Sequence, residues 1–185
     1  MVCNLFLTII LKILSLLPKY KQNKIEHLFF QDALQFNWQD FFKQFKLQDK
    51  KIWLVSNLPY NISAPLLIQF LQQAPVHYMT LMFQKEVAQR LTAEPGGKTY
   101  GILSVLCAAQ YERAYCFTVA PGAFIPPPKV DSGVIRFKRK ADYKLPVPED
   151  QFRMVVKTAF NQRRKTLRNA LKALPLPGWQ KASGL

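Results

Sequence analysis

Four consecutive residues, Asn57-Leu58-Pro59-Tyr60, carry the groups with the clearest chemical use in this sequence. They follow an apolar run, residues 52–55, that is typical of a buried strand. Ligands of open α/β sheets bind at the carboxyl ends of strands, where this stretch presents an amide, two backbone carbonyls and an aromatic ring. The Asn57 side-chain oxygen, with the Leu58 or Pro59 carbonyl as second acceptor, could take the two N–H bonds of an aryl amine and aim its lone pair at an electrophile. The stretch therefore suits methylation of an amine on a flat base, although an ordinary strand-end turn uses the same residue types.

The rest of the chain predicts the elements that position this stretch. Strands are expected at residues 28–30, 52–55, 78–83, 115–119 and 134–137, and helices at 38–45, 64–71, 84–93 and 100–110. The last two strands are expected to pair around a Pro-rich loop. Strands that alternate with helices predict a mostly parallel sheet with helices on both faces. Residues 138–149 have the composition of a linker, and residues 150–174 are predicted to form two helices.

The composition and net charge of the chain indicate which class of molecule it binds. The chain has 185 residues, 49% of them hydrophobic, which is enough for one domain with a core and a small appendage. Its net charge of +15 favours a polyanionic partner, with RNA or DNA the usual candidate. Cys3, Cys107 and Cys116 have no metal-ligand spacing and are odd in number, which favours a reducing compartment. We assign no catalytic or metal role to His27 or His77.

A run of cations near the C-terminus is the best candidate for contact with that polyanion. No acidic residue lies between residues 151 and 185. If the run is helical, Arg164 and Arg168 share one face, as do Arg168 and Lys172. Such a ridge can hold phosphates without reading base sequence, although a solvated helix face is the simpler alternative. The members of the run are Arg163, Arg164, Lys165, Arg168 and Lys172.

Two further side chains complete the set of candidates. Asp32 follows the predicted strand at residues 28–30, and a carboxylate there can accept a hydrogen bond from an exocyclic amine. A helix N-cap is the alternative role for Asp32. Phe160, like Tyr60, is a candidate for stacking on a base that has left its helix. Core packing is the equal alternative for Phe160.

Together these stretches closely resemble one family, the ribosomal RNA small-subunit adenine dimethyltransferases linked to kasugamycin sensitivity. The resemblance covers roughly residues 19–174. It implies a Rossmann-like S-adenosylmethionine-dependent methyltransferase sheet (residues 1–140) followed by a small α-helical RNA-binding domain (residues 141–185). The stretches that carry it are Gln31-Asp32-Ala33-Leu34, Asn57-Leu58-Pro59-Tyr60, residues 120–124 with 126–132, and residues 159–169.

The resemblance also implies a role for each candidate. Asp32 and Ala33 would lie at the adenine of S-adenosylmethionine, and Asn57 would contact both the cofactor and the target amine. Tyr60 would lie against the target base, and Phe160 would close over it. The proline run at residues 126–128 would shape the substrate entrance. The implied substrate is a pair of adjacent adenines in small-subunit rRNA, each dimethylated, and the partner is the immature small ribosomal subunit.

The N-terminal part of the chain departs from the family pattern. The family carries a Gly-rich loop and then an acid ahead of the position of Asp32, whereas the first glycine here is Gly96 and the first acid is Glu26. The first two strands are therefore absent or replaced by residues 1–17, which we expect to form a buried or partly buried helix. The sheet should then have an unpaired edge. The methyltransferase sheet is thus N-terminally incomplete, half of the cofactor site is missing, and the helical domain is shortened.

Other assignments stay open on the sequence. The erythromycin-resistance methylases of large-subunit rRNA share the sheet and a similar tetrapeptide, but residues 163–169 favour the small-subunit family. A catalytically inactive ribosome-assembly or organellar transcription-factor relative, or a truncated fragment, is the alternative to an enzyme. Asp32, Asn57 and Tyr60 favour catalysis, and the missing loop favours inactivity. We expect a monomer in the cytoplasm, with an organelle as the alternative and with no metal and no membrane partner.

Overall fold

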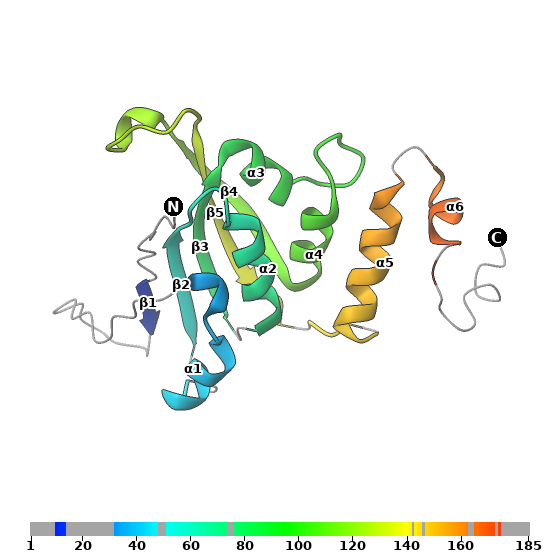
Figure 1. The fold of residues 1–185 in the computed structure, drawn as a ribbon, viewed down its shortest axis with the longest axis horizontal. Coiled ribbons are helices and arrows are strands. Elements are labelled where there is room, and N and C mark those ends of the chain that lie inside the picture. The colour runs from blue at the N-terminus through cyan, green and yellow to red at the C-terminus, as the bar shows by residue number, and fades with distance from the viewer. Residues whose placement is uncertain are drawn as a thin grey trace.

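The protein is built around a five-stranded sheet with the strand order β1-β2-β3-β5-β4 (Figure 1). A computed structural model describes residues 10–13 (backbone), 32–47, 51–73, 76–141, 143–145, 147–162, 165–172 and 174. The strands are β1 (Ile10–Ile13), β2 (Ile52–Asn57), β3 (Tyr78–Gln84), β4 (Tyr111–Val119) and β5 (Ser132–Arg139). The four strands predicted from residue 52 onward are confirmed, and the one predicted at residues 28–30 lies outside the described residues.

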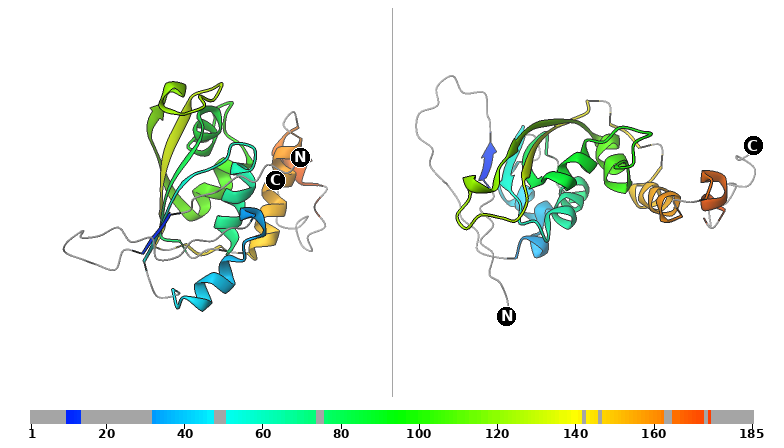
Figure 2. Two further views of the ribbon diagram at one scale, coloured as in Figure 1. Left: turned by 60° about the vertical axis from the view of Figure 1, so that its left-hand side comes forward. Right: turned by 90° about the horizontal axis from the view of Figure 1, so that it is seen from above.

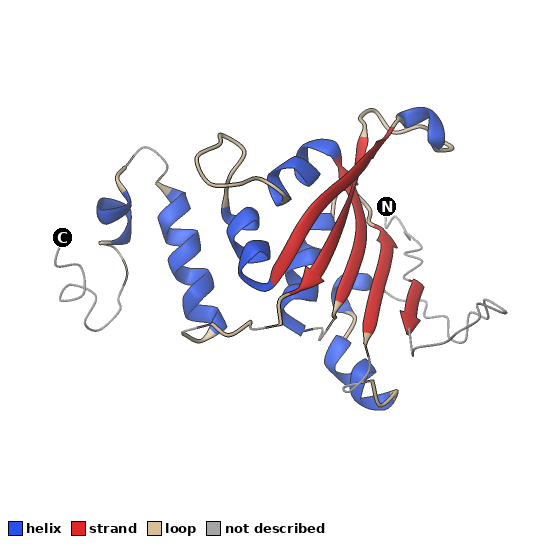
Figure 3. Cartoon of the chain, turned by 180° about the vertical axis from the view of Figure 1, so that it is seen from behind, coloured by secondary structure: helices blue, strands red, loops and turns tan. Residues whose placement is uncertain are grey.

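Four helices pack on one face of this sheet (Figures 2 and 3). They confirm the helices expected between residues 38 and 110, with bounds that shift by a few residues at each end. The prediction that helices cover both faces is wrong for the described part of the chain. The helices are α1 (Trp38–Gln44), α2 (Ser63–Gln73), α3 (Lys85–Leu91) and α4 (Ile102–Gln110). Two short 3₁₀ turns accompany them: η1 (Ala33–Gln35) precedes α1, and η2 (Pro121–Ala123) lies between β4 and β5.

The sheet is mixed, which corrects the prediction of a mostly parallel one. Among the described strands only β2 and β3 pair in parallel, while β1–β2, β3–β5 and β4–β5 are antiparallel. The reason lies in the chain order after α4. β4 forms the edge, and a hairpin returns β5 into the position between β3 and β4, so that β5 runs against both neighbours.

Residues 10–13 overturn the helix that was predicted for the N-terminal apolar segment. They form β1, which pairs antiparallel with β2 in the register Ile10↔Val55 to Ile13↔Ile52. The edge of β2 that was expected to be unpaired therefore has a partner along these four residues. A short apolar run fits a strand as well as a helix, and unpaired N–H and C=O groups on β2 favour the strand. The rest of residues 1–17 lies outside the described residues.

The core lies between the sheet and the helices on its covered face. Burial alternates along β2 and β3, so every second side chain points toward the helices. Trp38 of α1 meets Phe70 of α2 edge to face, with ring centroids 5.2 Å apart. On the uncovered face the side chains of β2 and β3 are half exposed or exposed, and Trp53 Nε1 donates to Thr80 Oγ1 at 3.0 Å. This hydrogen bond links β2 to β3, and Asn57, the last residue of β2, begins the candidate site.

Two more helices follow the sheet, as the sequence predicted. They are α5 (Glu149–Asn161) and α6 (Leu167–Leu171). Phe152 and Phe160 of α5 pack against the core, and the Phe160 ring lies 5.9 Å from that of Tyr100. The domain boundary at residue 140 stays a prediction. None of the helices in the described ranges is long and apolar enough to cross a membrane.

Gly133 allows α3 to approach the sheet, which gives the first testable prediction. A Cβ at Gly133 would lie 2.6 Å from Ala88 Cβ on α3 and 2.9 Å from the Tyr115 ring. Both contacts are too short, and Ala88 and Gly133 are buried, so the helix itself must move. We expect Gly133→Ala to lower the free energy of unfolding by about 1–3 kcal/mol, as overpacking usually does. Urea unfolding followed by circular dichroism measures the change.

Gly122 provides the matched control for that substitution. A Cβ there would meet nothing within 4 Å, so Gly122→Ala should leave the unfolding free energy nearly unchanged. Adding Ala88→Gly to the Gly133→Ala variant removes the closest clash and should recover part of the loss, although glycine within a helix itself costs about 1 kcal/mol. Equal stability of Gly133→Ala and Gly122→Ala would contradict the close packing of α3 on β5.

Candidate active site

The Asn57–Tyr60 stretch forms a turn at the carboxyl end of β2. The Leu58 side chain is only 1% exposed, and its N–H donates to the Met82 carbonyl of β3 at 3.3 Å. Beyond it, the Pro59 carbonyl accepts from Ile62 N–H at 3.1 Å, and the Tyr60 carbonyl accepts from Ser63 Oγ at 3.1 Å. The buried leucine thus fixes the turn to the sheet, and the other two bonds lead directly into α2.

Asn57 lies at the rim of this turn with its side chain exposed. No hydrogen bond among the described residues engages its amide or the carbonyl of Leu58. The Pro59 carbonyl, by contrast, already accepts one bond within the turn. The sequence left the second acceptor open between Leu58 and Pro59, and this arrangement favours Leu58. The turn therefore offers two acceptor groups on consecutive residues, a side-chain amide and a backbone carbonyl, that have no hydrogen-bond partner within the described ranges.

Tyr60 is tied to a distant part of the chain, a link that sequence reasoning missed. Its hydroxyl lies 2.5 Å from Ser132 Oγ at the start of β5. The preceding residue, Asp131, pairs with Lys85 Nζ at 2.9 Å, and this hydrogen bond raises the pKa of the lysine ammonium. Asp131 and Ser132 both belong to residues 126–132, which carried part of the family resemblance, but the sequence does not indicate which residues they contact. The end of the proline-rich loop is thus connected to the turn after β2 and to the start of α3.

Asp32 adopts the alternative role that the sequence left open. It caps η1, with Oδ1 accepting from Leu34 N–H at 2.9 Å and Oδ2 from Gln35 Nε2 at 3.4 Å. Its side chain is exposed, so the carboxylate keeps lone pairs for a further donor, while Ala33 beside it is buried. Gln69 of α2 holds η1 in place by donating to the carbonyls of Leu34 and Phe36 at 3.2 and 3.0 Å. α2 thus connects η1 to the turn that carries Asn57.

The basic cluster does not form one continuous helical ridge. α5 ends at Asn161 and α6 begins at Leu167, because Thr166 caps a new helix and its Oγ1 accepts from Asn169 N–H. The prediction that Arg164 and Arg168 share a helix face depends on Arg164 and stays a prediction. Lys165, Arg168 and Lys172 are exposed. Arg163 and Arg164 lie outside the described residues.

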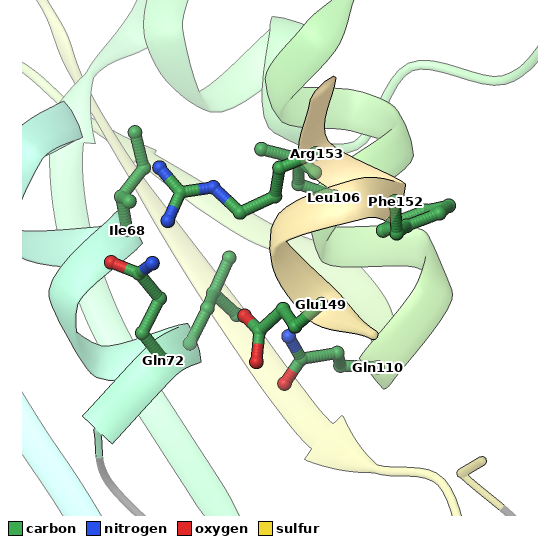
Figure 4. Close-up of a pocket in the computed structure, with 8 residues that line it drawn as sticks. Ile68, Gln72, Leu106, Gln110, Glu149, Phe152 and Arg153 are labelled. Carbon is green, nitrogen blue, oxygen red and sulfur yellow. The ribbon is translucent and has the colours of Figure 1, made fainter. Parts of the chain in front are cut away.

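A small cavity lies between α2, α4 and α5 (Figure 4). Arg153 and Glu149 of α5 point across it toward Ile68 and Gln72 of α2 (Figure 4). Its volume of about 10 Å³ holds roughly one water molecule, so it cannot take a cofactor or a base.

In the part of the chain that the structure describes, no group of three or more His, Cys, Asp or Glu could hold a metal ion. Burial raises the pKa of the Cys107 thiol to about 12, which makes it unreactive.

The fold and the turn together define a Rossmann-like methyltransferase core. A dimethyladenosine transferase from Plasmodium falciparum superposes with a TM-score of 0.59 at 31% identity, covering 64% of this chain and 44% of its own. The 23S rRNA methyltransferase ErmE superposes with a TM-score of 0.53 over 65% of this chain and 50% of its own. At 24% identity, the similarity to ErmE supports only the fold.

Sequence comparison identifies the family. Residues 10–183 match the profile of the family Ribosomal RNA adenine dimethylase, and this chain belongs to that family. It is 48% identical over 162 residues to "Ribosomal RNA small subunit methyltransferase A" of Flavobacterium johnsoniae, covering 86% of this chain and 58% of the relative. The protein of the same name from Bacteroides thetaiotaomicron is 46% identical over 150 residues, or 80% of this chain and 54% of the relative. The chain thus spans a little over half the length of these bacterial relatives.

Proposed function

We propose that this chain carries the target-base and RNA-binding part of an S-adenosylmethionine-dependent dimethyltransferase of adenine amines in small-subunit rRNA. The observation that carries the proposal is the turn after β2. It holds the exposed amide of Asn57, the carbonyl of Leu58 and the half-buried Tyr60 within four consecutive residues, and neither the amide nor the Leu58 carbonyl has a hydrogen-bond partner in the part of the chain that the structure describes. Membership in the family and the names of the relatives support the choice of rRNA and of adenine.

The groups of the turn match the needs of an adenine amine. Its nitrogen is a poor nucleophile because the lone pair is delocalised into the ring. Asn57 Oδ1 and the Leu58 carbonyl would each accept one N–H, which turns the lone pair out of the ring plane and toward the methyl group. Tyr60 would stack on the base and hold it in that orientation. Catalysis of this kind is positioning, since no residue needs to remove a proton before the methyl transfer.

The residues present fit part of the cofactor. S-adenosylmethionine would supply a methyl group on a sulfonium that is already reactive. The exposed carboxylate of Asp32 and the adjacent Ala33 fit the adenine end, and Asn57 fits the methyl end. No glycine precedes Gly96 in this sequence, so the backbone turn that the family resemblance implies at the methionine end has no counterpart in residues 1–95. The fit therefore covers the adenine and methyl ends only.

The test is a calorimetric titration of the purified chain with S-adenosylmethionine, followed by transfer of labelled methyl groups to immature small ribosomal subunits. The proposal expects measurable binding and the appearance of N6,N6-dimethyladenosine in the rRNA. A chain that binds the rRNA, binds no S-adenosylmethionine and transfers no methyl group would instead be the inactive rRNA-binding relative. The cytoplasm is the location that this proposal implies.

The exposed cations around α6 give a prediction for the RNA contact. Replacing Lys165, Arg168 and Lys172 by glutamine should weaken rRNA binding by a similar factor for any RNA sequence, since phosphates carry no sequence information. The slope of log K against log salt should become shallower by about one unit for each lost phosphate contact. Filter binding at several salt concentrations measures both effects.

Lys43 supplies the control for that experiment. It is an exposed cation on α1, which lies far from α6 (Figure 1). Lys43→Gln removes one charge and should leave the salt slope unchanged. If it weakens binding as much as any single C-terminal substitution, binding depends on net charge alone and the cluster has no special role.

A further inference from the structure

The hydroxyl of Tyr60 is held by a buried partner. It lies 2.5 Å from Ser132 Oγ, and the two residues are 72 positions apart in the sequence. Ser132 is 0% exposed, whereas Tyr60 is half buried at the rim of the candidate site. The bond therefore fixes the hydroxyl end of a tyrosine that is itself only half buried.

Ser132 is itself held on both sides. It is the first residue of β5 and pairs with Gln84 of β3 and with Val119 of β4. The residue before it is also anchored: the Asp131 carbonyl accepts from Lys85 N–H at 2.9 Å, and its carboxylate pairs with Lys85 Nζ at 2.9 Å. A serine in such a position can hardly move toward a displaced tyrosine. Because Ser132 is fixed in the sheet, its hydrogen bond also holds the Tyr60 hydroxyl in place.

The opposite end of Tyr60 is fixed by its backbone. Its carbonyl accepts from Ser63 Oγ at 3.1 Å at the start of α2. A tyrosine on a turn can otherwise rotate about both side-chain torsions, and ordering such a side chain when a ligand binds weakens the interaction. With both ends held, the position of the ring is set before a base arrives.

We propose that Ser132 is a positioning residue that fixes the position of the Tyr60 ring for stacking on the target base. The inference rests on the proposed function, because the base it concerns is the adenine that is methylated. Ser132 touches neither the base nor the cofactor in this proposal. It acts only through the tyrosine hydroxyl. Loss of the bond should then weaken stacking without removing the aromatic surface.

The experiment measures stacking directly, with a small-subunit rRNA hairpin in which one of two adjacent adenines is replaced by 2-aminopurine. Fluorescence is recorded on RNA that is fully bound, so differences in affinity do not enter. Wild type should quench the probe, and Tyr60→Ala should give the unquenched limit. Ser132→Ala and Tyr60→Phe should each be brighter than wild type. The double variant should be no brighter than either single variant, because all three lack the same hydrogen bond.

Steady-state kinetics provides the second readout. For Ser132→Ala and Tyr60→Phe we expect kcat/KM of methyl transfer to fall by about two- to tenfold, the range set by ordering one side chain. Ser104 supplies a matched control, since it is another fully buried serine, and its hydroxyl donates to the Arg90 carbonyl. Ser104→Ala should lower the melting temperature without changing the fluorescence of bound RNA. Tyr60→Phe keeps the test decisive if Ser132→Ala fails to fold.

The outcomes separate this proposal from the proposed function. Quenching by wild type that depends on Ser132, without methyl transfer, would leave the positioning role in place and refute the enzyme. Wild type that binds the hairpin without quenching would overturn the positioning role. So would a Tyr60→Phe variant that quenches as fully as wild type, or losses in the two single variants that multiply in the double variant.

Discussion

Replacing Asn57 with alanine is expected to lower kcat/KM of methyl transfer by about a hundredfold or more, because removal of one preorganised polar group from a reacting centre has effects of that size. The side chain is exposed at the end of β2 and has no hydrogen bond among the described residues. Nothing in the described part of the fold therefore depends on the amide, and its loss should act on the chemistry alone. Affinity for rRNA should stay within about twofold, since phosphate contacts dominate it.

Two measurements and one control decide this prediction. Methyl transfer is followed with labelled S-adenosylmethionine on immature small subunits, and rRNA binding is measured separately by filter retention. Asn61 is the matched control, because it is another exposed asparagine four residues further along, beyond the proposed acceptors. Asn61→Ala should behave as wild type. An Asn57→Ala variant with near-normal turnover would remove the proposed role of the amide.

The sequence was sufficient for the parts of the fold whose signals are local. The run at residues 52–55 is apolar and branched, and a polar turn follows it, so the strand and the position of Asn57 at its end could be predicted. The same holds for α2 and α4, whose apolar residues recur on one helical face. The breaker at residues 95–97 placed the end of the helix that precedes it.

The sequence was insufficient wherever a second segment decides the outcome. The run that includes Ile10–Ile13 fits either a helix or a strand, and only the edge of β2 selects the strand. The pairing of β4 with β5 was predicted and is confirmed, but the position of β5 next to β3 was not, because it depends on a distant segment. The contact between Tyr60 and Ser132 joins distant segments through two hydroxyls that have many possible partners. The basic run was taken as one helix, but the cap formed by Thr166 divides it.

Replacing Phe70 with alanine is expected to be the most destabilising single change, with a loss of about 3–5 kcal/mol in the free energy of unfolding. Phe70 is 0% exposed in the middle of α2, and its ring meets that of Trp38 edge to face at 5.2 Å. Trp38 belongs to α1, so the cavity cannot close without moving one helix relative to the other. A typical domain has only about 5–15 kcal/mol of total stability, so the variant should be close to unfolding at 37 °C.

Phe117 of β4 shows whether the effect comes from burial or from residue type. Its side chain is 58% exposed, so Phe117→Ala should change the unfolding free energy by less than about 0.5 kcal/mol. Chemical denaturation of both variants under the same conditions gives the comparison, and a loss below about 1.5 kcal/mol for Phe70→Ala would mean that α2 can collapse onto the cavity.

α2 begins three residues after Tyr60 and also holds η1 through Gln69. A packing defect under this helix should therefore loosen the Asn57 turn and Asp32 together, and rRNA binding by α6 should suffer least.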